Sequence, residues 1–510
     1  MKLVRAALLA VVLAVVLLGR VSAAPSSCES LLTLPLDRTT VTQAELVGAG
    51  AFRAPGPAPN AQNAARLAQL PAFCRVAATV KPTSDSDIKI EVWMPASGWN
   101  GKLQAVGNGG WAGTISYPAM AQALARGYAT TSTDTGHSTP GGSFAFGHPE
   151  KLVDYAYRSE HEMTVNAKSI IGAFYGSRPA RSYFNGCSTG GRQALTEASR
   201  YPDDFDGIIA GAAANPKTRL DTWRIWMGLE TLKDPEARIP QEKYSAIHQA
   251  VLAACDGLDG LKDGLLTDPT RCHFDPQILA CKGGDAPGCL MPKQVQSVRT
   301  VLGPARSPHT GAEIFGGFQP GSELLWSRLI GGPEPLETAL DQFKFMVFND
   351  PKWDWRTFEV DRDLAKAEQA LKGLLTAIDP SSLGAFFGRG GKLLTYHGWA
   401  DQDISPMASV NFYRSVGSAL GEAKVSSGMR LFMVPGMGHC GGGEGPNTFD
   451  MMTPLEQWVE KGQAPARIVA SHSTNGKVDR TRPLCAYPQV ARYTGTGSTD
   501  EAENFTCQLP

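Results

Sequence analysis

The segment Gly186-Cys187-Ser188-Thr189-Gly190 constrains the fold of this chain more than any other. A Gly-x-Ser-x-Gly sequence that follows a strand pattern is typical of a strained strand-to-helix turn, which exposes a serine hydroxyl. A second dipeptide, His439-Cys440, mirrors Cys187-Ser188 far downstream. A disulfide from Cys187 to Cys440 would hold the neighbour of a candidate nucleophile against the neighbour of a candidate base. The two motifs therefore predict that distant parts of the chain meet at one site.

Short strand patterns alternate with helical patterns on both sides of this turn. Such alternation favours βαβ units around a mostly parallel sheet with flanking helices, which is the α/β fold class. The expected strands are Ile88–Met94, Lys102–Val106, Ala129–Thr133, Ser182–Asn185, Leu393–Tyr396 and Arg430–Val434, and the expected helices include Leu152–Tyr175 and Ala408–Leu420.

Between residues 215 and 383 the pattern changes to helical stretches separated by Gly/Pro-rich loops. Gln241–Ala254 and Leu364–Leu375 are expected helices, and strand patterning is nearly absent. A chain of this length exceeds one compact core, so a second module is expected. We predict a catalytic domain of residues 24–214 and 384–510. A mainly helical lid of residues 215–383 would be inserted between the nucleophile and the catalytic acid.

The first residues have the pattern of a secretory signal. Lys2 and Arg5 precede an apolar run, and small residues follow, so residues 1–23 are predicted to be cleaved after Ala23. An uncleaved membrane anchor is the alternative. All ten cysteines lie beyond this leader, and an even number in an exported chain favours disulfides. We expect a secreted protein, periplasmic or extracellular, whose mature form has no membrane segment.

The balance of charged residues in the chain bears on whether it binds nucleic acid. The 48 Lys and Arg residues nearly balance the 49 Asp and Glu residues, and no basic tract occurs. Nucleic acid is therefore not an expected partner. The sequence gives no indication of the oligomeric state.

Three residues have the order of a Ser-Asp-His catalytic triad. Ser188 would be the nucleophile, Asp401 follows the expected strand Leu393–Tyr396, and His439 follows Arg430–Val434. Both the order and the placement on loops after strands fit an α/β-hydrolase. Asp403 is a rival for Asp401, and His397 could compete with His439 as the base, although a role in shaping the pocket suits His397 better.

An oxyanion hole needs two backbone N–H donors near the nucleophile. Thr189 follows Ser188 directly and would provide one of them. The glycine-rich segment Gly107–Trp111 follows the expected strand Lys102–Val106 and would provide the other. Gly110 is the preferred donor over Gly109, and a plain tight turn is the alternative.

An acidic loop over residues 255–265 predicts a structural calcium site. Calcium takes six to eight oxygen ligands from carboxylates and backbone carbonyls. The carboxylates would come from Asp256, Asp259 and Asp263, and the carbonyls from Leu261 and Leu265. The spacing differs from that of an EF-hand, and a solvated Asp-Gly turn is the alternative.

Over nearly the whole mature chain, the sequence resembles the tannase/feruloyl esterase family. That family includes feruloyl esterases, tannases and mono(2-hydroxyethyl) terephthalate hydrolase. The paired Cys187-Ser188 and His439-Cys440 motifs carry the resemblance, together with segments 148–151 and 157–163. The resemblance implies an α/β-hydrolase core with a large lid that holds calcium on the five residues named above. It also implies the disulfides Cys28–Cys74, Cys187–Cys440, Cys255–Cys272, Cys281–Cys289 and Cys485–Cys507.

These observations together predict a secreted serine esterase that cleaves esters of small phenolic acids. Feruloyl esters are the first expectation and gallate esters the second. Ile404 stands where the terephthalate-active relative presents an aromatic residue, which argues against that third activity. Trp353 and Trp355 would either stack on an aromatic acyl group or lie in the core of the lid. A non-catalytic ligand-binding module of the same fold and a secreted peptidase are the alternatives of other classes.

Overall fold

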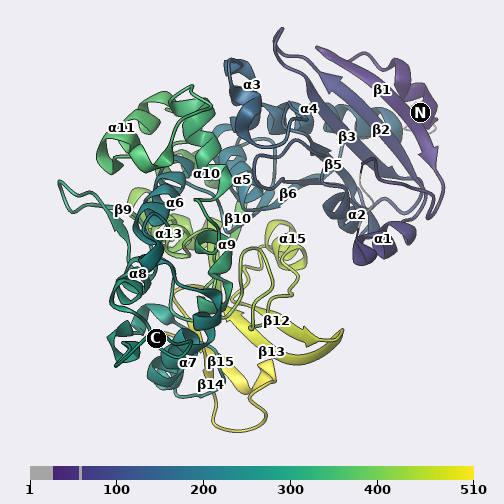
Figure 1. Cartoon of the computed structure of the whole chain (residues 1–510). Helices are drawn as coiled ribbons and strands as arrows, with labels where there is room; N and C mark the ends of the chain where they lie inside the picture. The colour runs from purple at the N-terminus through teal and green to yellow at the C-terminus, as the bar shows by residue number, and fades with distance from the viewer. Residues whose placement is uncertain (1–26, 57–59) are drawn as a thin grey trace, which may run out of the picture.

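The computed structural model describes residues 27–56 and 60–510, and a nine-stranded sheet runs through its centre (Figure 1). The strand order is β1-β2-β3-β5-β4-β6-β7-β10-β11. The strands are β1 (Thr39–Val47), β2 (Phe73–Val80), β3 (Ile88–Pro95), β4 (Lys102–Val106), β5 (Ala129–Thr133), β6 (Arg181–Cys187), β7 (Gly207–Gly211), β10 (Lys392–Gly398) and β11 (Met429–Val434).

Six strands of this sheet are parallel, and their shared direction creates the site. β1, β2 and β3 pair antiparallel with their neighbours, whereas β5, β4, β6, β7, β10 and β11 run parallel. The carboxyl ends of parallel strands lie at one edge of a sheet. The loops that follow β4, β6, β10 and β11 therefore converge there, and they carry the four candidate catalytic segments.

Helices cover both faces of the sheet. On one face, α4, α5, α12, α13 and α14 contribute to an apolar core that includes Ile170, Leu195 and Val416. On the other face, α2 and α15 pack over Tyr183, Ile209 and Leu394. These helices are α2 (Tyr117–Ala125), α4 (Ser159–Tyr175), α5 (Thr189–Arg200), α12 (Leu383–Gly388), α13 (Met407–Leu420), α14 (Glu422–Gly428) and α15 (Met452–Lys461). α1 (Ala61–Ala68) lies against α2.

The chain between β7 and β10 contributes no strand to the nine-stranded sheet and provides most of a second apolar core, to which Trp111 and Tyr155 also contribute. Trp223, Phe318, Trp326 and Phe343 are fully buried at the centre of that core. In Figure 1 its helices lie beside the sheet, away from β1, β2 and β3. The elements are α6 (Lys217–Thr231), α7 (Tyr244–Cys255), α8 (Pro292–Leu302), β8 (Ala305–Arg306), β9 (Glu313–Phe315), α9 (Ser327–Ile330), α10 (Glu337–Asp341) and α11 (Val360–Ala370).

Two small hairpins complete the chain after α15. They are formed by β12 (Arg467–Thr474) with β13 (Lys477–Cys485), and by β14 (Val490–Tyr493) with β15 (Phe505–Gln508). The carboxyl terminus thus lies near α7 of the inserted region (Figure 1).

The architecture confirms the predicted α/β-hydrolase fold class. β4 and β5 have the predicted bounds, and the other four predicted strands extend slightly further. The predicted helix Leu152–Tyr175 begins earlier, with α3 (Pro149–Val153), and a π-helical turn at Asp154–Arg158 joins it to α4. The predicted helix Leu364–Leu375 is shifted, because α11 starts at Val360 and ends at Ala370.

The predicted leader, residues 1–23, lies outside the described residues. Within residues 27–56 and 60–510, we find no helix that is both long and apolar enough to cross a membrane.

Candidate active site

Ser188 occupies a sharp turn between β6 and α5. Its φ of 64° and ψ of −122° place it in the left-handed region, which costs on the order of 1–3 kcal/mol for a residue with a side chain. Close packing makes glycine necessary around it. A Cβ atom added to Gly186 would lie 2.5 Å from the Gly190 carbonyl oxygen, and one added to Gly107 would lie 2.6 Å from the Gly190 Cα. This strained turn exposes the Ser188 side chain above the sheet.

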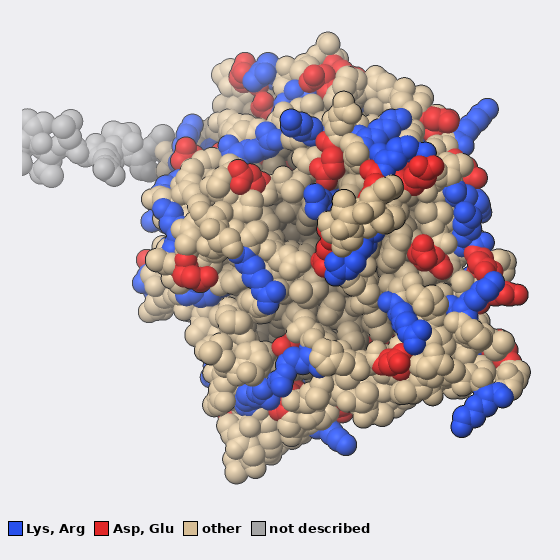
Figure 2. Space-filling view, turned by 90° about the vertical axis from the view of Figure 1, so that its left-hand side faces the viewer, with Lys and Arg blue, Asp and Glu red and all other residues tan. Residues whose placement is uncertain are grey.

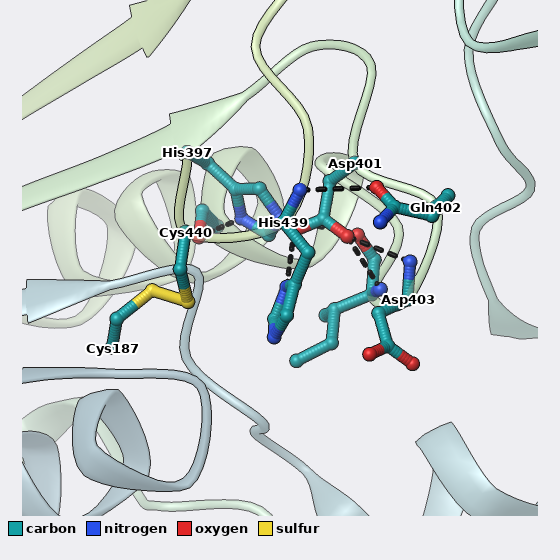
Figure 3. Close-up of a disulfide and its surroundings, with 9 residues drawn as sticks. Cys187, His397, Asp401, Gln402, Asp403, His439 and Cys440 are labelled. Carbon is teal, nitrogen blue, oxygen red and sulfur yellow. Dashed lines mark hydrogen bonds and ion pairs between the residues drawn. A yellow bond between two sulfur atoms is a disulfide. The ribbon is translucent and has the colours of Figure 1, made fainter. Parts of the chain in front are cut away.

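The disulfide between Cys187 and Cys440 joins this turn to the loop after β11 (Figure 3). Their Cα atoms are 6.0 Å apart. Ser188 and His439 are the adjacent residues, so the link fixes the two candidate catalytic side chains beside each other. The structure joins all ten cysteines in the pairs that the resemblance implies: Cys28–Cys74, Cys187–Cys440, Cys255–Cys272, Cys281–Cys289 and Cys485–Cys507.

Asp401 lies against His439 in the loop after β10. Its Oδ2 atom is 2.8 Å from His439 Nδ1, and its Oδ1 atom accepts hydrogen bonds from the Asp403 and Ile404 amides. The Asp401 side chain is fully buried. The amide of His439 also donates to Gln402 Oε1, so both loops are held together (Figure 3).

His397 supports Asp401 and is not placed to act on Ser188. Its Nε2 atom lies 3.0 Å from Asp401 Oδ2 and 3.1 Å from the Ile404 carbonyl oxygen. Both of those atoms are acceptors, so Nε2 carries a proton, and Nδ1 faces the Ser409 hydroxyl at 2.7 Å. The ring is completely buried. His397 therefore orients the carboxylate that orients His439.

Asp403 points away from His439. Its carboxylate accepts a hydrogen bond from Arg224 at 2.9 Å and lies 3.4 Å from Arg328. The structure thus brings together Ser188, Asp401 and His439, and it commits the rival acid to two arginines.

The interaction between Asp401 and His439 gives His439 the basicity that a general base needs. Burial alone would raise the pKa of Asp401, but the charge of His439 and hydrogen bonds from both histidines hold that pKa well below its usual range. Burial disfavours protonation of His439, yet the Asp401 carboxylate outweighs it and raises the pKa of His439. A histidine of raised basicity can take a serine proton and stabilise the resulting imidazolium.

The loop after β4 supplies candidate oxyanion donors. The Gly109 carbonyl accepts from the Ala112 amide, so the Gly110 N–H of the same trans peptide points the opposite way. The Gly110 carbonyl accepts from the Thr189 hydroxyl at 2.7 Å and the Tyr155 hydroxyl at 2.9 Å. These bonds fix Gly110 beside α5, and Gly109, Gly110 and Thr189 line one pocket with Ser188.

A buried amide network, which the sequence did not reveal, holds this loop. Gln193 of α5 accepts a hydrogen bond from the Asn108 amide at 2.9 Å and donates to Asn108 Oδ1 and to Glu160. The Gly190 amide donates to the Asn108 carbonyl. Burial raises the pKa of Glu160 to about 7. Only the folded arrangement could identify Gln193, because its partner Asn108 lies 85 residues away in sequence.

The pocket over Ser188 has a volume of about 310 Å³ and is closed partly by the inserted region. That region contributes the following lining residues, none of which the sequence singled out: Lys217, Arg224, Arg328, Leu336 and Thr338. Ile404, as named above, is also part of the lining. Trp353 and Trp355 instead pack in the apolar core of the inserted region. On the face shown in Figure 2, acidic and basic side chains are interspersed around a hollow.

The acidic loop has donors of the type that calcium takes, but its geometry is not that of a formed calcium site. Asp263 forms an ion pair with buried Arg482, and the Asp256 carboxylate accepts from the Gly264 amide. Asp259 accepts from the Leu261 amide and from Thr267. Among the residues that the structure describes, no group of three His, Cys, Asp or Glu side chains is gathered closely enough to hold a metal ion. The calcium site, with Leu261 and Leu265 as carbonyl donors, stays a prediction.

Comparison with known proteins agrees with this geometry. A model of the family described as "Tannase and feruloyl esterase" matches residues 74–508. The chain belongs to the tannase and feruloyl esterase family. An uncharacterized esterase of Xanthomonas campestris pv. campestris is 38% identical, over 95% of this chain and 92% of that protein. A probable feruloyl esterase B-2 of Neosartorya fischeri is 34% identical, over 85% of this chain and 86% of its own length.

A solved structure shares the whole architecture. The crystal structure of feruloyl esterase B from Aspergillus oryzae superposes with a TM-score of 0.87 at 31% identity, and covers 94% of this chain and 99% of that chain. As a member of this family, the protein is a carboxylic ester hydrolase. The family and the fold expected from the sequence are therefore confirmed.

Proposed function

We propose that this family member is a secreted serine esterase that hydrolyses esters of small phenolic acids, with feruloyl esters preferred. One observation carries the proposal: Ser188, strained at its turn, lines the same pocket as His439, whose Nδ1 atom is bonded to buried Asp401. The names of relatives in two fungal species, both feruloyl esterases, support the acyl group.

In the proposed reaction, the free Nε2 atom of His439 takes the Ser188 proton as Oγ attacks the ester carbonyl. Asp401 holds the ring by its Nδ1–H and stabilises the imidazolium. The Thr189 and Gly110 amides bind the developing oxyanion. His439 then protonates the alcohol oxygen as the carbon–oxygen bond breaks, which leaves an acyl group on Ser188. Attack by water, with His439 again as base, releases the acid and restores the serine.

The pocket supports an aromatic acid of modest size. Its volume of about 310 Å³ is at the lower end of the range for small-molecule sites. Leu336, Ile404 and Ala214 offer apolar contacts to a ring, while the Thr338 hydroxyl and the exposed Arg328 offer donors to ring substituents. The five disulfides support an oxidising compartment, and hence secretion.

Initial rates on methyl ferulate, methyl gallate and mono(2-hydroxyethyl) terephthalate test the proposal. We expect methyl ferulate to have the highest kcat/KM, and Ser188→Ala to lower kcat by on the order of 10⁶-fold, because the nucleophile is lost. Ser199→Ala, at a half-buried hydroxyl that donates to the Thr196 carbonyl of the same helix and lies outside the pocket lining, is the matched control and should keep full activity. Turnover of none of the three esters by folded protein would overturn the phenolic-ester assignment. A preference for methyl gallate would overturn only the feruloyl choice.

A further inference from the structure

A second cavity of about 670 Å³ lies on the α2 and α15 face of the sheet, next to the catalytic pocket. Its floor is made by side chains of four neighbouring strands: Gln104 of β4, Asn185 of β6, Ile209 of β7 and Tyr396 of β10. Its walls are α2 and the segment 447–452 before α15. Cys440 lines both this cavity and the pocket over Ser188, so the Cys187–Cys440 disulfide stands between them.

Three polar side chains on this floor make no side-chain hydrogen bond to the described residues. Within the part of the chain that the structure describes, no residue forms a hydrogen bond with the carboxamides of Gln104 and Asn185 or with the Tyr396 hydroxyl. Gln104 is largely buried and Asn185 and Tyr396 are half-buried, but none of their polar side-chain atoms is fully enclosed by protein, so all three groups face the cavity. Polar groups that face one cavity and bond to no described residue are free to donate to and accept from a ligand.

The orientation of Tyr396 places its hydroxyl over the floor. Tyr396 is in register with Gly211 of β7, which is in register with Cys187 of β6. A Cβ atom added to Gly211 would lie 2.2 Å from Tyr396 Cζ and 2.5 Å from its hydroxyl oxygen. The phenol ring therefore lies across β7 in the direction of β6, the strand that carries Asn185. The lack of a side chain at Gly211 is what permits this.

The chemistry of the lining selects a neutral ligand rich in hydroxyl groups. The charged side chains in the lining, Arg126 and Asp450, form an ion pair with each other at 2.9 Å. Carboxamides and a phenol both donate and accept, as hydroxyl groups do. Phe449, which meets Tyr396 edge-on at 5.2 Å, and Met451 add apolar surface for the faces of a sugar ring.

We propose that this cavity is a saccharide-binding site, sized for a short neutral oligosaccharide and distinct from the pocket that holds the ester. The assignment does not depend on the acyl group that the enzyme cleaves. Its place beside the disulfide would keep the esterase on carbohydrate material while Ser188 acts on an attached or neighbouring ester.

Titration with xylobiose, followed by calorimetry on the Ser188→Ala protein, tests the proposal without catalysis. We expect saturable binding that Tyr396→Phe weakens about fivefold or more, since only one hydroxyl is removed, and that Gln104→Leu weakens at least as much. Gln463→Leu, at an exposed carboxamide beyond α15, is the matched control and should bind normally. Glycerol, which has hydroxyls but no ring faces, should bind far more weakly.

Two outcomes would overturn the proposal: no saturable binding of xylobiose to the folded protein, or binding that neither Tyr396→Phe nor Gln104→Leu changes. A crystal soaked with xylobiose gives the location independently. Sugar between α2 and segment 447–452 is expected, and sugar only in the pocket over Ser188 would contradict the assignment. Loss of ester turnover in Ser188→Ala with xylobiose binding retained separates this site from the proposed esterase function.

Discussion

Two loops of this protein carry closely spaced aspartates that predict a functional site, but the aspartates of the two loops make very different contacts. In the loop after β10, Asp401 accepts hydrogen bonds from two backbone amides and lies within bonding distance of two histidines. In the loop at residues 255–265, Asp263 is committed to Arg482 and the other carboxylates bond to nearby amides and Thr267. The first loop directly follows the internal strand β10, and the second lies in the inserted region. The fold therefore fixes Asp401 against His439, whereas the calcium site of the second loop stays a prediction.

After loss of the nucleophile itself, the largest loss of kcat is expected when the charge of the catalytic acid is removed. Asp401→Asn should lower kcat by about 10⁴-fold, because an amide neither fixes the His439 tautomer nor stabilises the imidazolium. Asp403→Asn is the matched variant in the same loop, and its carboxylate faces Arg224 instead of His439. It should lower kcat by at most about tenfold, since it alters only pocket contacts. Steady-state rates on methyl ferulate decide, and equal losses in both variants would refute the assignment.

The next-largest loss of kcat is expected when the disulfide between the two catalytic loops is removed. Cys187→Ala with Cys440→Ala should lower kcat by about 10²-fold, because a displacement of about 1 Å between nucleophile and base has that cost. Cys281→Ala with Cys289→Ala removes a disulfide of the inserted region that lines no part of the catalytic pocket. That control should keep kcat. Full activity of the first double variant would show that the catalytic loops hold their places without the covalent link.

The pH dependence follows from the interaction of His439 with Asp401. A base acts only when unprotonated, so kcat/KM should fall tenfold per pH unit below the His439 pKa. Because the Asp401 carboxylate raises that pKa, the acidic limb should lie above pH 6.5, the ordinary value for histidine. Removing the charge in Asp401→Asn should move the limb to lower pH. An unchanged limb in that variant would mean that another group titrates.

Calcium should give the smallest effect on catalysis. If the acidic loop binds the ion, millimolar calcium should raise Tm by several degrees after treatment with a chelator, since a ligand of the folded state stabilises it. Asp259→Asn should abolish that shift. The loop contributes no residue to the pocket over Ser188, so kcat should change little. A Tm that calcium leaves unchanged would show that the pairing of Asp263 with Arg482 is the final state of the loop.

The sheet and the candidate triad could be predicted because each depends on local patterns. Polar and apolar residues alternate at the start of Lys102–Val106, and Ala129–Thr133 is rich in β-branched threonine, as strands are. The order of Ser188, Asp401 and His439 matches the order along the chain of strands whose carboxyl ends lie on one side of the sheet. The sequence could only favour Asp401 over Asp403, because both residues lie in the loop after β10. The direction of their side chains, which the sequence does not give, decides which of them contacts His439.

The remainder of the site could not be read from the sequence, since it depends on contacts between distant segments. Arg224 meets Asp403 from 179 residues away, and Gln193 meets Asn108 from 85 residues away. Neither arginine nor glutamine has a local pattern that marks such a role. Of the two placements expected for Trp353 and Trp355, the structure shows the core of the inserted region, a choice that the sequence left open because an aromatic side chain suits both.

Trapping the acyl-enzyme intermediate would decide whether Ser188 carries the acyl group. An activated ester such as 4-nitrophenyl ferulate makes deacylation the slower step, so a pre-steady-state burst should accompany acylation. We expect one equivalent of nitrophenolate per protein and, after acid quench, a feruloyl group on the peptide that contains Ser188. A feruloyl group on another residue, or steady turnover by Ser188→Ala, would contradict this role of Ser188.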